Sequence, residues 1–465
     1  MRFLLVAPPR KGPFGGSSYP PIGLGYLATV LRDMGHEPVI KDCIINGWTI
    51  EDLLSYIYTE RPDVVGINIF SSSVAYAKNI LDGIKQKNSK IITIIGGPHP
   101  TGVPAESLEY LSTADYGIVG EGEIPLRRLV TFLESGHGKK EDISGLIWRE
   151  GNSIRFNQKV ENKNIDDFGF PAWDLINPDR YFHLPWIGLH TGVILTSRGC
   201  PFSCEFCVKL GRKLRYRSLD KIYEELLLLH DQYGIDRFII QDEGFPIDTR
   251  FTKAFCRFMI DKGNKFKFVS GSGLRLSVLD DELLELLKQA NLDPLVGVGI
   301  ESGVQRVRNL MKKSLTDEQL YKGIDLLNKH GFLAAGNFIL GYPGETKEEM
   351  EETIRVATKL NLHSASFIPF APLPGSEATK KLIAKGELTK DVFTQINLDA
   401  VLYAPEGMTR DEIGAMRRKA VFRFNIRPKR LLFHITGGRL PFTFMKLVRI
   451  FFPSFLVPKS WRINQ

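Results

Sequence analysis

Hydrophobic and polar positions along the first third of the chain form short strand-like runs separated by longer helical segments. The β-rich apolar runs are 2–7, 37–42, 63–70, 90–97 and 115–120. The helix-length segments between and after them are 22–34, 50–59, 73–87, 104–111 and 123–135. Strands that alternate with helices at this spacing predict a parallel sheet covered on both faces. The pattern therefore predicts a wound α/β domain over residues 1–140.

A second strand–helix series follows a segment, 141–190, whose prolines and aromatic residues predict an ordered linker. Its expected strands are 192–197, 237–241, 266–270, 295–300, 332–340 and 364–370. Amphipathic helices follow most of them. Six such repeats, without a clear seventh and eighth, predict a partial (β/α)6 barrel of the TIM type over residues 191–400. Its site is expected at the carboxyl ends of the strands.

Composition argues against a disulfide-rich, a secreted or a membrane-spanning protein. The chain has 465 residues, of which 43% are apolar and 25% charged, so it is long enough for two or three domains with full cores. Five cysteines are too few for a disulfide framework, and the N-terminus has no signal-peptide layout. No stretch has the roughly 18 apolar residues of a membrane span. We expect a cytoplasmic protein that is soluble or peripheral.

The net charge of +8 is concentrated near the C-terminus, in a predicted helical extension over residues 401–465. Its basic residues alternate with phenylalanines and leucines: Arg417, Arg418, Lys419, Arg423, Arg427, Lys429, Arg430, Arg439, Lys446 and Arg449. Apolar residues recur at helical spacing between 441 and 456, which is typical of a helix that lies in a lipid interface. A basic helix packed on the barrel is the plain alternative, and contact with single-stranded RNA is a lesser one.

Small and turn-forming residues follow four strands of the first domain: "APPRKGPFGG" after 2–7, "SSS" at 71–73, "GGPHP" at 96–100 and "GEGE" at 120–123. In wound sheets a ligand lies beyond the carboxyl ends of the strands, so these loops are the candidate binding edge. Tight turns would account for any one of the loops. Neither GxGxxG nor GxxxxGK[ST] occurs, so the edge has no phosphate cradle of a dinucleotide or P-loop site.

Three cysteines lie in the segment "RGCPFSCEFC" (198–207), directly after the first strand of the second series: Cys200, Cys204 and Cys207. This compact loop can wrap one face of an inorganic cluster. Zinc sites pair Cys-x2-Cys with a second Cys or His pair, and none lies nearby in sequence. Cys256 shares an apolar helical stripe with phenylalanines, which indicates core packing. Three thiolates on a [4Fe–4S] cluster leave one iron open.

This loop closely resembles that of the radical S-adenosylmethionine (SAM) superfamily. The resemblance implies that SAM binds the open iron and is cleaved to a 5′-deoxyadenosyl radical. It continues through "QDEGF" (241–245), "GLRLSVLDDELLELL" (273–287), "GVGIESGVQRVRNLMKK" (297–313) and "GNFILGYPGET" (336–346). The residues that it implies for SAM binding are Phe206, Asp242, Glu243, Arg275, Glu301, Ile339 and Gly341. A carboxylate at a strand end is also a common helix cap.

The first domain resembles the cobalamin-binding domain of one branch of this superfamily, in "YPPIGLGYLATVLRDMGHE" (19–37), "GGPHPTGVPAE" (96–106) and "VGEGE" (119–123). The implied cobalamin residues are Pro21, Gly23, Ser71, Ser72, Gly96, Gly97, His99, Gly120 and Glu121. The Asp-x-His-x-x-Gly motif of cobalamin-dependent mutases is absent after the first strand. Cobalt is therefore expected to lack a histidine ligand on its lower face. His99 is either a loop residue or a corrin contact.

These resemblances imply three cofactors: a [4Fe–4S] cluster, S-adenosyl-L-methionine and cobalamin. We expect methyl transfer to an unactivated carbon, with an oxidative cyclase or a rearrangement enzyme as the alternative. A cobalamin sensor and a tRNA methylthiotransferase fit less well, and we expect no nucleic acid partner. The expected partners are a flavodoxin- or ferredoxin-class reductant and a hydrophobic substrate such as a lipid, an isoprenoid or a tetrapyrrole. A peripheral membrane position would follow from the basic tail.

Overall fold

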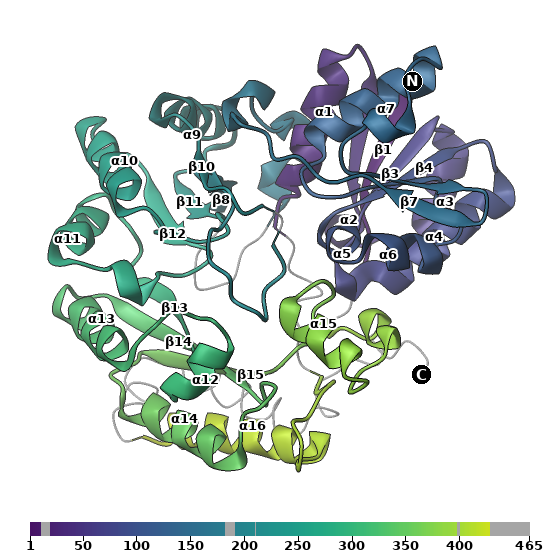
Figure 1. Ribbon diagram of the computed structural model, residues 1–465. Coiled ribbons are helices and arrows are strands. Elements are labelled where there is room, and N and C mark those ends of the chain that lie inside the picture. Colours follow the sequence, from purple (N-terminus) through teal and green to yellow (C-terminus); the bar gives the residue numbers. More distant parts are fainter. Residues whose placement is uncertain (11–18, 182–190, 210, 398–399, 428–465) are drawn as a thin grey trace. The chain divides into compact units, whose positions relative to one another are not determined.

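The computed structural model describes residues 1–10, 19–181, 191–209, 211–397 and 400–427 (Figure 1). The chain divides into two compact units. Unit 1 comprises residues 1–273, 285–293 and 372–397. Unit 2 comprises residues 274–284 and 294–371 together with the described residues 400–427. Helix α11 (Asp281–Gln289) contains residues of both units.

A seven-stranded sheet forms the first part of unit 1, in the order β2-β1-β3-β4-β5-β6-β7. Its first five strands are parallel: β1 (Arg2–Ala7), β2 (Glu37–Asp42), β3 (Val64–Asn68), β4 (Ile92–Gly96) and β5 (Tyr116–Ile118). They confirm the strands expected there. The antiparallel hairpin of β6 (Leu146–Glu150) and β7 (Ser153–Phe156) extends the sheet from within the segment expected to be a linker.

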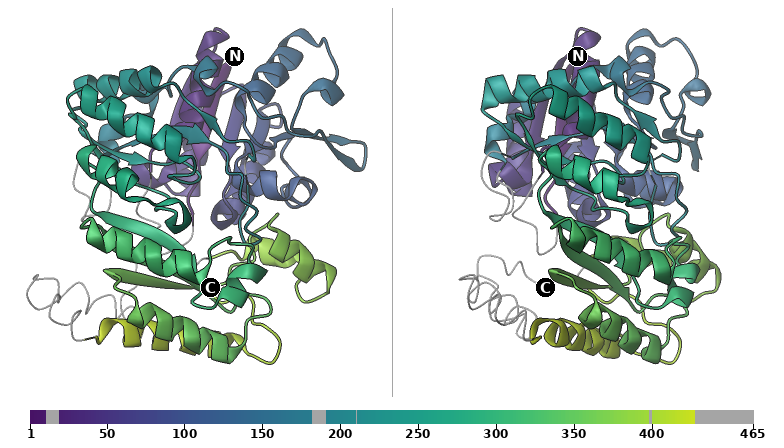
Figure 2. Two further views of the ribbon diagram at one scale, coloured as in Figure 1. Left: turned by 60° about the vertical axis from the view of Figure 1, so that its left-hand side comes forward. Right: turned by 90° about the vertical axis from the view of Figure 1, so that its left-hand side faces the viewer.

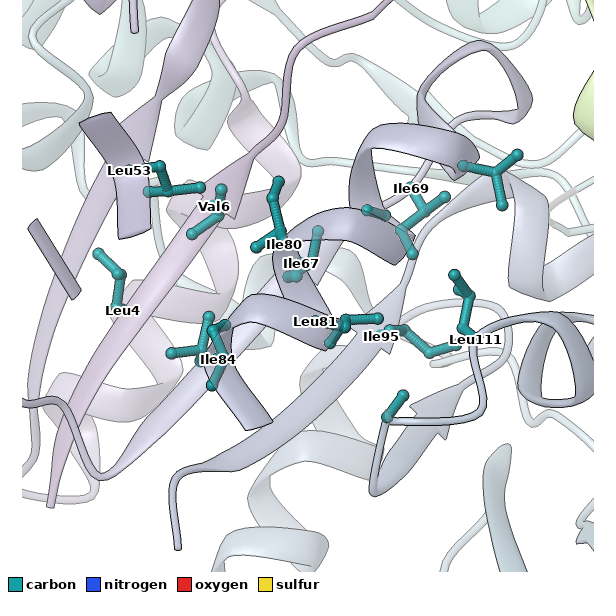
Figure 3. Packing of buried hydrophobic residues seen from close by; sticks show 14 of the residues in the cluster. Leu4, Val6, Leu53, Ile67, Ile69, Ile80, Leu81, Ile84, Ile95 and Leu111 are labelled. Atoms are coloured by element: carbon teal, nitrogen blue, oxygen red, sulfur yellow. The ribbon is translucent and has the colours of Figure 1, made fainter. Parts of the chain in front are cut away.

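Helices cover both faces of this sheet: α1 (Ile22–Asp33), α2 (Cys43–Asn46), α3 (Ile50–Glu60), α4 (Val74–Lys87), α5 (Pro98–Gly102), α6 (Pro104–Tyr110) and α7 (Glu123–Ser135). On one face, Leu4 and Val6 of β1 pack among buried residues of α3 and α4 (Figure 3). Because successive strand residues point to opposite faces, Phe3 and Leu5 point to the other side. On that side α1 packs against α7.

The second sheet of unit 1 is parallel, in the order β12-β11-β8, with β8 (Thr191–Ile194), β11 (Arg237–Ile240) and β12 (Lys267–Ser270). Helix α9 (Leu219–Tyr233) begins where the Ser218 side chain accepts from the amide of Lys221, and ends at Gly234, whose φ is 65°. Helix α10 (Thr249–Asp261) follows β11. The short antiparallel ribbon of β9 (Ser197–Arg198) and β10 (Arg215–Tyr216) lies on either side of the cysteine segment in sequence.

Unit 2 contains a parallel sheet in the order β13-β14-β15, with β13 (Leu295–Glu301), β14 (Leu333–Leu340) and β15 (Ser364–Pro369). Its helices are α12 (Gln305–Leu310), α13 (Asp317–Lys329), α14 (Lys347–Lys359) and α16 (Arg410–Asn425). Helices α14 and α16 lie side by side (Figures 1 and 2). The six strands expected after the linker are all present, three in each unit.

Part of the basic C-terminal segment belongs to the fold of unit 2. On α16, Arg417 donates to the Phe367 carbonyl at 3.1 Å. Arg427, just after this helix, donates to the Thr358 carbonyl at 2.9 Å. The helix expected over 441–456 lies outside the described residues. Within the described ranges, no helix is long and apolar enough to cross a membrane.

Candidate functional site

A cavity of about 540 Å³ extends from the carboxyl edge of the seven-stranded sheet along the face that carries Phe3 and Leu5. Helix α1 forms another wall, through residues that include Leu24 and Leu27. The cavity also reaches the second sheet of unit 1, because Gln241 and Glu243, just after β11, line it. A largely apolar pocket of this size with a few polar groups is typical of a cofactor or ligand site.

Most of the small residues expected to bind cobalamin line this cavity: Pro21, Gly23, Gly96, Gly97, Gly120 and Glu121. Gly97 has a φ of 102°, and a Cβ atom there would lie 2.2 Å from the side-chain oxygen of Asn68. Only glycine permits this backbone conformation and this close approach. The strand-end loops therefore leave room at the sheet edge, as the sequence predicted.

Ser71, Ser72 and His99 are not among the residues that line the cavity. His99 is buried, its amide donates to the Ile69 carbonyl at 3.0 Å, and its Nδ1 lies 3.0 Å from the Ser71 hydroxyl. Burial lowers the pKa of His99 to about 4, against an opposing effect of Glu106. The imidazole is therefore neutral at pH 7. These contacts favour the loop interpretation of His99 over the corrin contact.

Glu121, Glu123 and Arg198 line one part of the cavity, and each takes part in an ion pair. Arg215 forms a bidentate pair with Glu121, at 2.6 and 2.8 Å, and Arg198 lies 2.8 Å from Glu123. Burial alone would raise the pKa of Glu121, but the hydrogen bonds and charge of Arg215, with the charge of Arg198, hold it below its ordinary value. Because both arginines belong to the β9–β10 ribbon, these pairs join the cavity to the base of the cysteine loop.

The cysteine loop is an excursion between β9 and β10. Arg198 and Arg215 are paired in register where the excursion begins and ends. The amide of Cys200 donates to the Gly211 carbonyl at 3.1 Å. Gly199 has a φ of 90°, and a Cβ atom there would lie 2.1 Å from the carbonyl oxygen of Lys213. The two arms of the loop therefore pack backbone against backbone.

The three cysteines share this loop, and the charges of Cys200 and Cys204 act on the Cys207 thiol. The amide of Cys207 donates to the Cys204 carbonyl at 3.3 Å. Cys207 is exposed. Partial desolvation, followed by the charges of Cys204 and Cys200, raises the pKa of its thiol to about 11. In the described ranges, no three Cys, His, Asp or Glu side chains are grouped so that they could hold a single metal ion. A polynuclear cluster makes a different demand, because each thiolate binds a different iron.

The other two cysteines are buried in the core. Cys256 is 0% exposed on α10 and Cys43 is 1% exposed at the start of α2. Burial raises the pKa of both thiols to about 12. Thiols that stay protonated in an apolar core are poor ligands and nucleophiles. The core position expected for Cys256 is confirmed.

Asp242 and Glu243, expected at the SAM site, differ in their surroundings. Asp242 is 3% exposed, and its carboxylate accepts from the Thr196 amide at 2.8 Å and from the Ser197 hydroxyl at 2.7 Å. It therefore fixes the chain just before the cysteine loop. Glu243 lines the cavity. Phe206 is half-buried inside the cysteine loop.

In unit 2, Lys313 links two of the expected SAM residues. Its Nζ lies 2.6 Å from a carboxylate oxygen of Glu301, whose φ is 67°. Its backbone carbonyl accepts from Arg275 at 3.3 Å. Glu301 is at the end of β13, where the register with β14 shifts between Gly299 and Glu301. Arg275 and Glu301 are thus brought together at one end of this sheet.

Ile339 and Gly341 lie at the end of β14 and just after it, and the loop is fixed by a glutamate that sequence reasoning missed. A carboxylate oxygen of Glu345 accepts from the amides of Gly341 at 2.7 Å and Tyr342 at 3.1 Å. The other oxygen, Oε1, is buried and has no hydrogen-bond partner within the part of the chain that the structure describes. Burial raises the pKa of Glu345 to about 8, although the two amides oppose the shift. The sequence "GET" (344–346) indicates the start of a helix, but it does not indicate that Glu345 binds the amides of the preceding loop.

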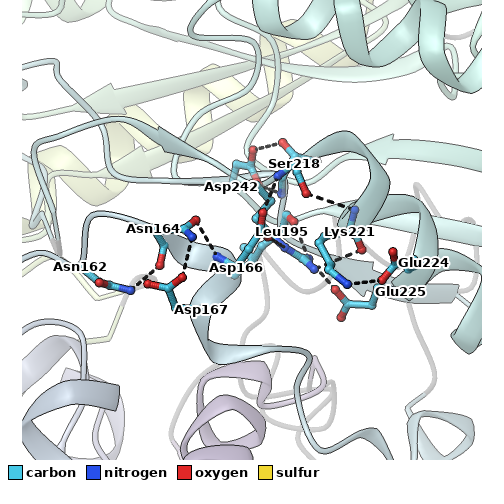
Figure 4. A network of polar contacts seen from close by, with 12 residues as sticks. Asn162, Asn164, Asp166, Asp167, Leu195, Ser218, Lys221, Glu224, Glu225 and Asp242 are labelled. Carbon is cyan, nitrogen blue, oxygen red and sulfur yellow. Dashed lines mark hydrogen bonds and ion pairs between the residues drawn. The ribbon is translucent and has the colours of Figure 1, made fainter.

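A polar network, buried around Glu225 and exposed at its margins, joins the segment before β8 to the second sheet of unit 1 (Figure 4). Arg217 and Glu225 are both about 1% exposed and lie 2.5 Å apart. Glu225 also accepts from the Trp173 indole at 2.9 Å, and Asp166 accepts from the Ser218 amide at 2.8 Å. The aromatic and acidic residues of the segment 157–181 thus fix the base from which the ribbon and the cysteine loop extend.

Comparison with known proteins agrees with this geometry. Residues 15–130 match the model of the B12 binding domain, and residues 194–357 match that of the radical SAM superfamily. An uncharacterized methyltransferase of Pyrococcus horikoshii is 31% identical over 441 residues, which are 93% of this chain and 94% of that protein. The chain belongs to the cobalamin-binding radical SAM enzymes.

Two further proteins place this radical SAM enzyme among its relatives. The anaerobic magnesium-protoporphyrin IX monomethyl ester cyclase of Rubrivivax gelatinosus is 27% identical, over 89% of this chain and 75% of the cyclase. The radical S-adenosylmethionine methyltransferase TsrM from Kitasatospora setae has the same fold, with a TM-score of 0.68. The match covers 83% of this chain and 75% of TsrM at 22% identity.

The family confirms the predicted fold class, the enzyme class and the three cofactors, which are cobalamin, a [4Fe–4S] cluster and S-adenosyl-L-methionine. A radical SAM enzyme also needs an external reductant. The residues that hold each cofactor and the domain boundaries at 140, 190 and 400 stay predictions.

Proposed function

We propose that this enzyme transfers a methyl group to an unactivated carbon of its substrate, with cobalamin held in the cavity of unit 1. The observation that carries the proposal is that one cavity is lined both by the glycine-rich edge of the first sheet and by residues just after β11. The cysteine loop follows β8, which is the neighbour of β11. Cobalamin held at the glycine-rich edge of the seven-stranded sheet would therefore lie beside the ends of β8 and β11, where the cysteine loop begins.

The residues present fit the cofactors. When bound, the cluster and SAM supply a carbon-centred radical that abstracts hydrogen, and cobalamin supplies the methyl group. Cys200, Cys204 and Cys207 would ligate the cluster. Apolar residues such as Leu5 and Leu24 would exclude water from the reacting groups. Arg275, Glu301 and Gly341 of unit 2 would bind the cosubstrate, in the roles that the superfamily resemblance implies.

The degree of similarity to the relatives supports methyl transfer over cyclisation. This chain is 31% identical to the Pyrococcus horikoshii methyltransferase over 93% of its residues and 27% identical to the cyclase over 89%. Cyclisation with the same cofactors remains the second candidate, because the cyclase is 27% identical over most of this chain.

Product analysis with labelled SAM tests the proposal. The reconstituted enzyme, a reductant and a candidate substrate are incubated with methyl-labelled SAM. We expect the label to appear in the product together with unlabelled 5′-deoxyadenosine. Deoxyadenosine with an oxidised or cyclised product that contains no label would contradict methyl transfer and favour the cyclase. A Cys204→Ala variant should form neither product.

We propose further that the substrate is hydrophobic and that the basic residues after 427 hold the enzyme at an anionic membrane surface. The support is the alternation of basic and aromatic residues over 428–462. The chain truncated after Arg427 retains α16, whose buried residues include Ile413 and Phe424. We expect the full chain to co-sediment with anionic vesicles, less so at high salt, and the truncated chain not to. Equal binding by both chains would contradict the proposal.

A further inference from the structure

The segment 372–397 returns to unit 1 after the last strand of unit 2. It contains helix α15 (Glu377–Ala384) and the 3-10 helix η6 (Lys390–Thr394). Within unit 1 it contacts two places that the proposed function assigns to different cofactors. One is the cysteine loop, and the other is the loop region that follows β3 and β4 of the seven-stranded sheet.

The contact with the cysteine loop is centred on Glu205, which lies between Cys204 and Phe206. The Ala378 amide donates to the Glu205 carbonyl at 3.0 Å. Lys381 donates to both carboxylate oxygens of Glu205, at 2.7 and 2.8 Å. Glu205 is only 5% exposed. A buried carboxylate needs such a partner, because its charge is costly to hold away from water.

The contact with helices α5 and α6, beside the seven-stranded sheet, combines a close backbone approach and an ion pair. A Cβ atom on Gly102 of α5 would lie 2.3 Å from the carbonyl oxygen of Pro374. A Cβ atom on Gly375, whose φ is 85°, would lie 2.5 Å from the Gly102 backbone. Lys390 of η6 pairs with Glu106 of α6 at 2.9 Å. Side chains at either glycine would separate the two segments.

We propose that the segment 372–397 is a clamp that fixes the cysteine loop against the cobalamin-binding edge, with Lys381 as its positioning residue. The inference rests on the cofactor sites proposed above. The cysteine loop has little regular structure of its own between β9 and β10, so contacts from outside must fix it. The clamp thereby sets the spacing between the cluster and cobalamin, and Lys381 acts through Glu205 without touching either cofactor.

Hydrogen exchange of the cofactor-free protein tests the clamp directly. In Lys381→Met, Glu205 loses its charged partner, and we expect amides of residues 200–207 to exchange roughly tenfold faster, in line with the loss of one charged hydrogen-bond pair. Lys380→Met is the matched control, since Lys380 is exposed on the same helix and pairs with Glu377. Lys381→Arg should restore protection. Unchanged exchange at 200–207 in Lys381→Met would overturn the clamp.

A second variant keeps the test decisive if Lys381→Met folds poorly. Adding Glu205→Gln removes the buried charge that needed the lysine, so the double variant should be more stable than Lys381→Met and regain part of its protection. A double variant with no recovery would contradict the role of the pair.

Pulsed EPR between Co(II) cobalamin and the reduced cluster measures the spacing in the loaded protein. We expect a broader distance distribution in Lys381→Met and an unchanged one in Lys380→Met. A distribution equal to wild type would contradict the positioning role. Absence of cobalamin or cluster from the wild-type protein would instead contradict the cofactor sites, while the exchange experiment would still decide the clamp.

Discussion

Gly23 offers a direct way to fill the cavity without disturbing the fold. It lies at the second position of α1 and lines the cavity, and a Cβ atom there would meet no atom of the described residues within 4 Å. Gly25, two residues further along α1, provides the contrast. A Cβ atom on Gly25 would lie 2.7 Å from side-chain atoms of Pro171 and Ile176. Substitution at Gly23 should therefore change the ligand site, and substitution at Gly25 the packing.

The expected magnitudes follow from these surroundings. Gly23→Ala should stabilise the cofactor-free protein by about 0.5 kcal/mol, because alanine is the better helix former and has open space. Gly23→Leu adds a branched side chain at the wall of a cavity of about 540 Å³. It should weaken cobalamin binding by about tenfold or more, which is about 1.4 kcal/mol. At a free cobalamin concentration of about 100 times the wild-type Kd, binding stabilises the wild type by about 2.7 kcal/mol and a tenfold weaker variant by about 1.4 kcal/mol.

Two measurements separate these effects. Urea unfolding of the cofactor-free variants gives the change in folding stability, and an absorbance titration with cobalamin gives the affinity. We expect Gly23→Leu to be as stable as the wild type but to bind weakly, and Gly25→Ala to be destabilised. If Gly23→Leu is folded and binds cobalamin with wild-type affinity, the assignment of the cavity to cobalamin is wrong.

Three further predictions concern the cluster, a buried carboxyl group and a buried ion pair. Cys204→Ala should lose its cluster iron after reconstitution, whereas Cys256→Ala should retain it, as iron analysis can show; full iron in the first would contradict the assignment. The pKa of Glu345 is raised to about 8 from an unfolded value of 4.5, so the folded chain keeps a proton that the unfolded chain loses. The contribution of Glu345 to the free energy of unfolding is complete below pH 4.5 and is lost as the pH rises toward 8, at up to about 1.4 kcal/mol per pH unit. Urea unfolding of Glu345→Gln at several pH values should show a weaker fall of stability with pH. An unchanged fall would refute the raised pKa. Arg217→Met should cost about 3–5 kcal/mol by leaving the Glu225 carboxylate buried and uncompensated, and a loss below about 1 kcal/mol in urea unfolding would contradict that burial.

The sequence predicted the parallel strands because their apolar runs and the helices between them are regular. It missed the β6–β7 hairpin, although Gly151 and Asn152 form a two-residue turn of the kind that joins antiparallel strands. The prolines and aromatic residues downstream of this turn predicted an ordered linker instead. The hairpin pairs with β5 through a register that only the folded sheet defines.

The candidate site was predictable where a motif fixes it and not where packing does. The spacing of the three cysteines predicted the cysteine loop as the cluster site, and the glycines predicted the binding edge of the sheet; both assignments stay predictions. Sequence could not show that the Asp242 carboxylate accepts a hydrogen bond from the Thr196 hydroxyl. It also could not show that Lys381 pairs with Glu205, which lies 176 positions earlier in the chain. Such long-range polar contacts leave no local pattern, because each partner alone looks like an ordinary surface charge.

The central claim is that the cavity of unit 1 binds cobalamin without a histidine on cobalt, since His99 is buried against Ser71 and does not line the cavity. The EPR spectrum of Co(II) cobalamin bound to the protein tests it most directly. We predict a cobalt spectrum without nitrogen superhyperfine splitting, identical in the wild type and in His99→Gln. Splitting present in the wild type and lost in His99→Gln would contradict the account, and splitting in both would show that the benzimidazole tail stays on cobalt.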